Sequence, residues 1–181
     1  MDRCRHILLL LIWACLIQAV AAEAQPKAVS GILSLSGIGI GYEHDMADDS
    51  FVQVNLKTHI NRPFEDLSWD PDATLAFSWN MIFKRFRTRY NSDICLYAGP
   101  GAMVGWTKDL EAPHGAVFGV NGRFGAECHF VRRVTIAVSI VPTFGMHLSM
   151  NREGDYNMRT YRNGLTYDLL PEIGIKYRFG R

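Results

Sequence analysis

The chain has 181 residues, of which 48% are hydrophobic, 12% aromatic and 20% charged, and its formal net charge is +1. This length fits one domain, and the near-zero charge excludes a strongly basic nucleic-acid-binding protein. The aromatic content and the low charge also exclude a disordered chain and a coiled coil, since both classes are rich in charge and poor in aromatic residues.

Residues 1–24 have the pattern of a secretory signal peptide. Two arginines near the start precede an apolar run, and small residues then cluster up to Ala24. The run is shorter than the roughly 20 residues of a membrane-spanning helix, which makes a retained anchor the weaker interpretation. We expect cleavage after Ala24, with Ala21 and Ala22 as alternatives, so that residues 25–181 form one mature domain.

The mature chain would keep two cysteines, Cys95 and Cys128, which are too few for a disulfide scaffold. The sequence contains no CxxC, HExxH or GxSxG motif and no glycine-rich phosphate-binding loop. We therefore expect a protein without a cofactor, without a metal and without enzymatic activity.

Beyond residue 30, apolar and polar residues alternate in segment after segment, and no apolar stretch is long enough for a transmembrane helix. In residues 50–60, Val52 and Val54 share one face of a strand, while Gln53 and Asn55 share the other. The alternation predicts seven strands, in residues 37–43, 50–60, 73–84, 91–106, 116–130, 133–148 and 169–179. An eighth strand is assigned to residues 27–34, because a barrel with both ends of its chain on the same side of a membrane needs an even number of strands.

Alternation fits a soluble β-sandwich as well as a membrane barrel, but three features favour the barrel. Most of the strands span about 11–16 residues, whereas strands of soluble sheets average about 5–6. The polar face is rich in Gly, Ser, Thr and Asn, which suits a narrow lumen. Aromatic residues gather near strand ends, namely Phe83, Phe86, Tyr90, Trp106, Phe130, Tyr177 and Phe179. We therefore predict an all-β fold, a closed antiparallel up-and-down transmembrane β-barrel of about eight strands.

Connection lengths predict the direction of the barrel, because bacterial barrels have short periplasmic turns and longer outer loops. The short connections at 44–49, Arg85–Thr88 and Val131–Arg132 are expected in the periplasm. The longer connections are then expected outside, and they cover residues 61–72, 107–115 and 149–165.

Three segments have the pattern of strands in small outer-membrane barrels, namely GIGIGYEHD (37–45), YAGPGAMVGW (97–106) and PEIGIKYRF (171–179). Through them the chain resembles the eight-stranded barrels of the OmpX and OmpA transmembrane type and, more narrowly, the porin-like barrels of Bacteroidetes. The resemblance covers about residues 27–181 and concerns architecture.

This resemblance implies that the barrel-insertion machinery reads the last strand, which in the family ends on an aromatic residue. Ile173, Ile175, Tyr177 and Phe179 match that pattern. Two residues follow Phe179 here, whereas the family's chains usually end on the aromatic residue.

The lumen is expected to contain titratable side chains of both signs, namely Lys57, His59, Arg123, Glu127, His129, Glu172, Lys176 and Arg178. Arg123 and Glu127 are two same-face steps apart, and so are Glu172 and Lys176, which would allow pairing between neighbouring strands. Buried charges must be paired wherever they occur. We predict a structural ion-pair network, with conduction or a proton relay as the alternative.

One short motif points to chemistry. His147 and Ser149, followed by Glu153, resemble the His-x-Ser element of outer-membrane lipid A deacylases, in which a histidine activates a serine for ester hydrolysis. Met150 stands where that family has Asn, and alternation points His147 toward the lumen. The simpler interpretation is that His147 lies at the rim of the barrel near Ser149 in a loop and has no catalytic role.

Three prolines interrupt the predicted strands, and each removes a hydrogen bond from the sheet. Hairpin pairing places Pro100 and Pro142 opposite Asn121–Gly122, with Pro171 near Pro142. This level is interpreted as the outer rim, with a lateral gap that admits lipid as the alternative.

The sequence thus predicts a monomeric protein in the outer membrane of a Gram-negative cell envelope, with a structural or surface-interaction role through its outer loops. The expected partners are outer-membrane lipid, lipopolysaccharide and the insertion machinery, and nucleic acid is not expected. A lipid A deacylase-like hydrolase and a small-solute pore are the alternative functions.

Overall fold

The computed structural model describes residues 27–34, 37–59, 72–88, 92–110, 112–131, 133–150 and 154–179. The predicted signal peptide and nearly all of the predicted loop at 61–72 lie outside these residues. Within them, no helix has the length and apolar character needed to cross a membrane.

Ten strands and one short helix make up the described part of the chain. They are β1 (Lys27–Ser34), β2 (Gly37–Ala47), β3 (Ser50–His59), β4 (Ala73–Arg87), β5 (Asp93–Asp109), β6 (Ala112–Val131), β7 (Val134–Ile140), β8 (Thr143–Met150), β9 (Tyr156–Thr160), α2 (Asn163–Thr166) and β10 (Glu172–Phe179).

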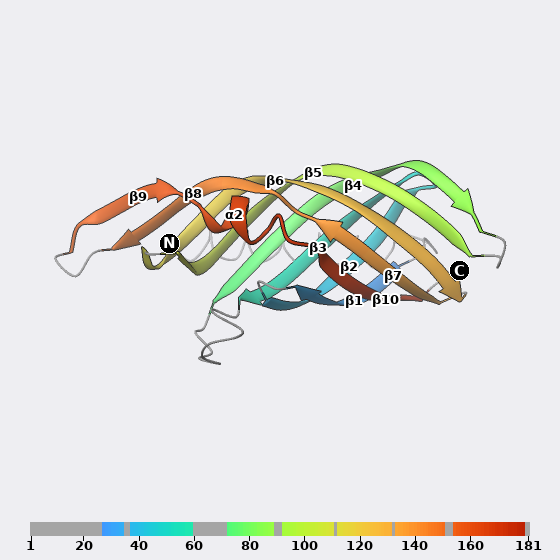
Figure 1. Ribbon diagram of the computed structural model, residues 1–181. Helices are drawn as coiled ribbons and strands as arrows, with labels where there is room; N and C mark the ends of the chain where they lie inside the picture. The colour runs from blue at the N-terminus through green and yellow to red at the C-terminus, as the bar shows by residue number, and fades with distance from the viewer. Residues whose placement is uncertain are drawn as a thin grey trace, which may run out of the picture.

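The strands close into an eight-membered ring. Each of β1 to β6 pairs with the next strand along the chain. Strand β7 then pairs with β10, and β10 pairs with β1, so that the ring closes with every pairing antiparallel. In Figure 1 the strands run obliquely past one another, and the hairpin of β8 and β9 extends beyond the others at one end. The predicted closed, antiparallel, up-and-down eight-stranded barrel is confirmed.

The predicted strand at 133–148 is broken into β7 and β8 at Val141 and Pro142. Both halves pair with the single long strand β6. Pro142 has no N–H to donate, but its carbonyl accepts a hydrogen bond of 3.0 Å from the N–H of Gly122, which keeps the break attached to β6.

The predicted outer connection at 149–165 is not a plain loop, since part of it forms secondary structure. Residues 156–160 form β9, which pairs with β8 from Met146↔Thr160 to Met150↔Tyr156, and α2 follows. The sequence analysis missed this strand, because neither face of residues 156–160 is apolar throughout.

Two other connections are shorter or displaced. The predicted loop at 107–115 is a tight hairpin, because pairing continues to Asp109↔Ala112 and Leu110 turns the chain with a φ of 32°. The predicted turn at Arg85–Thr88 starts too early, because β4 continues to Arg87, which still pairs with Asp93. Polar residues at strand ends caused both errors.

The side chains alternate between an exposed outer face and a buried inner face. In β4, Leu75 and Phe77 are each 47% exposed, whereas Thr74 and Ala76 are 1% and 6% exposed. The outer face is therefore apolar and the inner face is mainly polar, which reverses the arrangement of a soluble sandwich.

The barrel wall has an uneven height. Strands β1 and β10 have 8 residues each, whereas β5 has 17 and β6 has 20. Pro100 and Pro142 do lie opposite residues 121–122, as predicted, but this level is the middle of β5 and β6. The rim interpretation is therefore wrong for β5 and β6 and fits only the side where β1 ends and β10 begins.

We expect the two cysteines of the barrel to stay unpaired. Cys95 of β5 is 3% exposed and lies on the inner face, whereas Cys128 of β6 lies on the outer face. Side chains on opposite faces cannot reach disulfide geometry. Alkylation of the unfolded, unreduced protein followed by mass spectrometry should find two modified thiols, and a native disulfide would show that the register is shifted in one of these strands.

Candidate functional site

The charged residues predicted for the lumen converge inside the barrel. Seven of the eight, all except His59, have described side chains, and each lies on the inner face of its strand. Only the backbone of His59 is described. The seven divide into two ion-pair clusters and a separate histidine.

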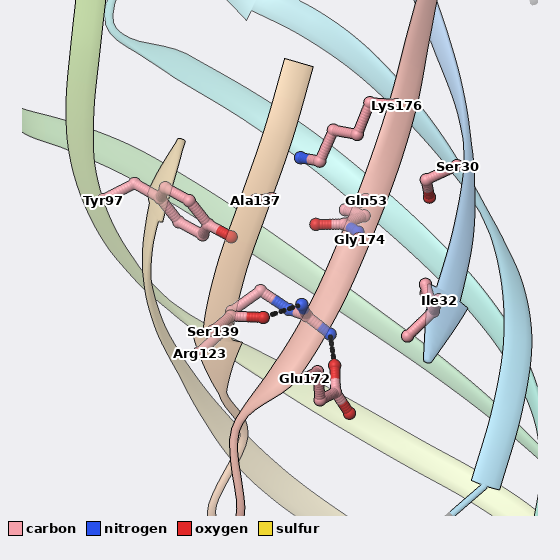
Figure 2. A pocket seen from close by; sticks show the side chains of 10 residues that line it. All are labelled: Ser30, Ile32, Gln53, Tyr97, Arg123, Ala137, Ser139, Glu172, Gly174 and Lys176. Atoms are coloured by element: carbon pink, nitrogen blue, oxygen red, sulfur yellow. Dashed lines mark hydrogen bonds and ion pairs between the residues drawn. The ribbon is translucent and has the colours of Figure 1, made fainter. Parts of the chain in front are cut away.

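The first cluster is centred on Glu172, the first residue of β10. Its carboxylate accepts hydrogen bonds from Nζ of Lys57 and, at 3.4 Å, from Nη2 of Arg123. Arg123 also donates from Nη1 to Oγ of Ser139 at 2.9 Å, as Figure 2 shows. All three charged side chains are almost fully buried, so that two cations from β3 and β6 meet one anion from β10.

The second cluster is centred on Lys176. Its Nζ donates to Glu43 of β2 and to Glu127 of β6, and the side chains of all three are at most 3% exposed. Arg178 donates to the same two carboxylates, at 3.0 Å to Glu43 and 3.3 Å to Glu127, and reaches Asp45 at 3.4 Å. Two cations of β10 are thus held between carboxylates of β2 and β6.

Small side chains on the intervening strands make these contacts possible. Strand β1 lies between β10 and β2 and places Ala28 and Ser30 beside the cations of β10. Strand β7 lies between β10 and β6 and places Thr135 opposite Lys176 and Ala137 opposite Gly174, the next inner-face residue of β10. Because these side chains are short, the long side chains of β10 pass over them and reach partners two strands away.

Aromatic rings complete the surroundings of Lys176. Phe51 and Tyr97 pack edge to face, with centroids 5.1 Å apart. Nζ of Lys176 lies 5.3 Å from the first centroid and 5.7 Å from the second, within the range of a cation–π interaction. The ring of Tyr97 lies directly on Gly125, where a Cβ atom would collide with it.

The two clusters are balanced in charge. Four cations, Lys57, Arg123, Lys176 and Arg178, face four carboxylates, Glu43, Asp45, Glu127 and Glu172. The sequence analysis missed Glu43 and Asp45, because it ended the strand at the first and assigned the second to a turn. The signal was available, since Gly39, Gly41, Glu43 and Asp45 continue one alternating face.

Little free space remains between the clusters. A cavity of about 10 Å³ lies among Tyr97, Arg123, Glu172 and Lys176, which is room for about one water molecule. Buried polar atoms without a partner, Oε1 of Gln53 and Nε of Arg123, belong to residues that line it. The arrangement suits a packed polar core rather than a passage for solutes.

His129 lies apart from these clusters. Its Nδ1 is 2.8 Å from Oγ1 of Thr135, and its Nε2 is 3.7 Å from Sγ of Cys95. Within the described residues, no group of three His, Cys, Asp or Glu side chains is arranged to hold a metal ion.

In the other half of the lumen, a bulge in β5 turns polar groups inward. At this bulge, between Thr107 and Asp109, the pairing with β6 shifts register. Asp72 accepts hydrogen bonds from Oγ1 of Thr107 at 2.9 Å and from N of Lys108 at 3.3 Å. Asp72 also lies 2.8 Å from Nε2 of His114, an ion pair when that imidazole is protonated.

The segment between β9 and β10 folds into this half of the lumen. The carboxylate of Asp109 accepts the N–H groups of Arg162 and Asn163, and Asn163 donates to the carbonyl of Lys108. Tyr161 is fully buried and packs in an apolar cluster with Ala76, Met103 and Val117. The connection therefore packs against the inner face of β4, β5 and β6.

The candidate hydrolase residues lie on this inner face. His147 is fully buried and its Nε2 donates to the carbonyl of Thr107 at 2.9 Å, while Ser149 is 3% exposed. No hydrogen bond joins His147 to Ser149 in the described structure, and Glu153 lies outside the described residues. This arrangement does not prepare a serine for attack on a lipid ester.

No protein-family model matches the chain, and no curated protein is similar to it. Among solved structures, it is similar to the N-terminal β-barrel domain of Pseudomonas aeruginosa OprF, with 9% identity over 86% of this chain and 98% of that one and a TM-score of 0.49. It is also similar to a major outer membrane protein from Thermus thermophilus, with 10% identity over 87% of this chain and 100% of that one and a TM-score of 0.41. A third similar structure is Neisserial surface protein A, with 13% identity over 87% of this chain and 96% of that one and a TM-score of 0.39. At these identities the likeness concerns the fold alone.

Replacing Lys176 by Met is expected to destabilise the barrel by about 3–5 kcal/mol, because Glu43 and Glu127 would remain buried beside less positive charge. Urea-induced unfolding of the protein in lipid vesicles measures the effect. Lys84→Met is the matched control, because Lys84 is exposed, and its expected cost is below about 1 kcal/mol. Equal costs for the two substitutions would show that the second cluster does not hold the barrel together.

Proposed function

We propose that this protein is an integral outer-membrane β-barrel of the OmpX and OmpA class in a Gram-negative cell envelope, with a structural or surface-interaction role and no catalysis. The observation that carries the proposal is the closed barrel with an apolar outside and a charged, filled inside. Only a closed barrel satisfies every backbone group of a membrane-spanning sheet, because it leaves no free edge.

The outer face has the composition that a lipid-facing surface needs. Large apolar side chains stand exposed around the ring, among them Ile40 at 63%, Val120 at 63%, Phe144 at 62% and Ile175 at 61%. A patch of this extent on a soluble monomer would cause aggregation. Lipid is the solvent in which the same surface is stable.

The two ends of the barrel differ in a way that supports an interaction role for one of them. The short connections from β2 to β3, from β4 to β5 and from β6 to β7 join their strands at one end, and bacterial barrels have their short connections in the periplasm. The opposite end carries the β8–β9 hairpin, where Tyr156 is 75% exposed and Met158 is 56% exposed. We assign this hairpin to the cell surface as the element that contacts partners.

Two alternative functions are less well supported. A small-solute pore needs a continuous passage, whereas ion pairs and the segment after β9 fill the lumen. A lipid A deacylase needs a serine and a histidine that lipid can reach, whereas His147 and Ser149 are buried on the inner face.

A matched pair of arginine substitutions tests the membrane assignment. Val138→Arg, on the outer face of β7, is expected to cost about 2–4 kcal/mol if Val138 lies near the bilayer midplane. Tyr156→Arg, at the tip of the β8–β9 hairpin, is expected to cost about 0–1 kcal/mol, because this residue would lie in water. The measurement is unfolding in lipid vesicles, combined with fractionation of cells that express each variant.

The wild-type protein should fractionate with outer membranes and migrate differently on gels before and after heating, since a closed barrel resists detergent. Recovery as a soluble periplasmic monomer would refute the proposal. Similar costs for Val138→Arg and Tyr156→Arg would refute the assignment of the lipid-facing band.

A further inference from the structure

The charges on the outer face have one sign. In the strands as described, the outward-facing side chains include Lys27 of β1 and Lys84 of β4 but no Asp or Glu. Both lysines lie at the end of the barrel that carries the tight turns. The carboxylates near this end belong to the lumen or to the turns, for example Asp45 and Asp49.

One part of this end combines cations with aromatic rings. Arg133, in the turn before β7, donates from Nη1 to the hydroxyl oxygen of Tyr177 at 3.1 Å, and this bond raises the pKa of the guanidinium. Tyr177 is 48% exposed on the outer face of β10. Because its oxygen accepts this bond, the phenol O–H is free to donate outward. The pair therefore presents two kinds of donor at the surface.

Lys27 lies on the other side of the same strand. It stands opposite Phe179 in the pairing of β1 with β10. On the β7 side of β10, the carbonyl of Arg133 accepts a hydrogen bond from the N–H of Arg178. Lys27 is thus level with Phe179 and Arg133 with Arg178, on opposite sides of β10 and about two strand spacings, or roughly 10 Å, apart. Side chains of this length can converge on one anion between them.

An apolar surface continues from this cationic end toward the middle of the barrel. Tyr177 lies between Val29 of β1 and Val134 of β7, and both valines are exposed on the outer face. Figure 1 shows β1, β10 and β7 side by side here. A ligand that fits has an anionic head at the level of Arg133 and Lys27 and a hydrocarbon chain along Tyr177 and the valines.

We propose that Arg133, Lys27 and Tyr177 form a binding site for the phosphate of an anionic phospholipid in the periplasmic leaflet. The inference rests on the proposed membrane location. The absence of outward carboxylates in the described strands favours a lipid with net negative charge over a zwitterionic one. The adjoining apolar surface favours a lipid over free inorganic phosphate.

Native mass spectrometry of the purified protein in detergent micelles tests the site, with phosphatidylglycerol and phosphatidylcholine of equal chain length added in turn. The wild type is expected to bind phosphatidylglycerol several-fold more tightly. Each of Lys27→Ser and Arg133→Ser is expected to weaken that binding about fivefold. Tyr177→Phe keeps the ring and is expected to weaken it about threefold.

Three controls make the result specific. Arg159→Ser, an exposed cation of β9 at the opposite end, should leave binding unchanged. Lys27→Arg with Arg133→Lys keeps both charges and should retain most of the affinity, which separates loss of charge from loss of fold. Inorganic phosphate at the same concentration as the lipid should not displace it.

Equal binding of the two lipids by the wild type, or an equal loss in Arg159→Ser, would overturn the inference. Displacement by inorganic phosphate would show an anion site without lipid specificity and would overturn it as well. These outcomes differ from failure of the proposed function, in which the protein would not fractionate with membranes at all.

Discussion

A charge buried inside a narrow barrel must find its counter-charge within reach of its own side chain, and this constraint shapes the interior of the protein. Lys176 meets it with two carboxylates and two aromatic rings. Removing one partner of such a set leaves an uncompensated charge, whereas the intact set is close to neutral in its effect on stability. The network is therefore better understood as a device that fixes the register of β2, β6 and β10 than as a store of stabilising energy.

The small residues of β1 and β7 belong to the same design. The inner face has short side chains on both sides of β10, namely Ala28 and Ser30 of β1 and Thr135 and Ala137 of β7. They leave space through which the cations of β10 reach their partners. A larger side chain on either strand would separate charges that are otherwise joined. The charged side chains of the second cluster thus come from three strands, β2, β6 and β10, while β1 and β7 provide space.

The alternation of apolar and polar residues was sufficient to predict most of the barrel. Strand β1 has the bounds that the sequence indicated, residues 27–34. Same-face spacing indicated ion pairs for Glu127 and Lys176 but placed them between neighbouring strands, whereas these two side chains meet across the intervening strand β7. The sequence analysis missed the elements in which apolar and polar residues do not alternate regularly. Strand β9 has exposed residues on both faces, and α2 is held by Asp109, a contact distant in sequence that no local pattern reveals.

The uneven wall has a consequence for the bilayer in which we propose that the barrel lies. Eight residues of a strand tilted by about 40° rise roughly 20 Å, which is less than the apolar band of about 25 Å typical of such barrels. Above β10 the wall continues as α2 and the irregular backbone that follows it, where Leu165, Tyr167 and Leu169 are exposed and the N–H groups of the first two bond within the segment. A bilayer of uniform thickness must therefore become thinner beside β1 and β10, or the barrel axis must tilt toward that side.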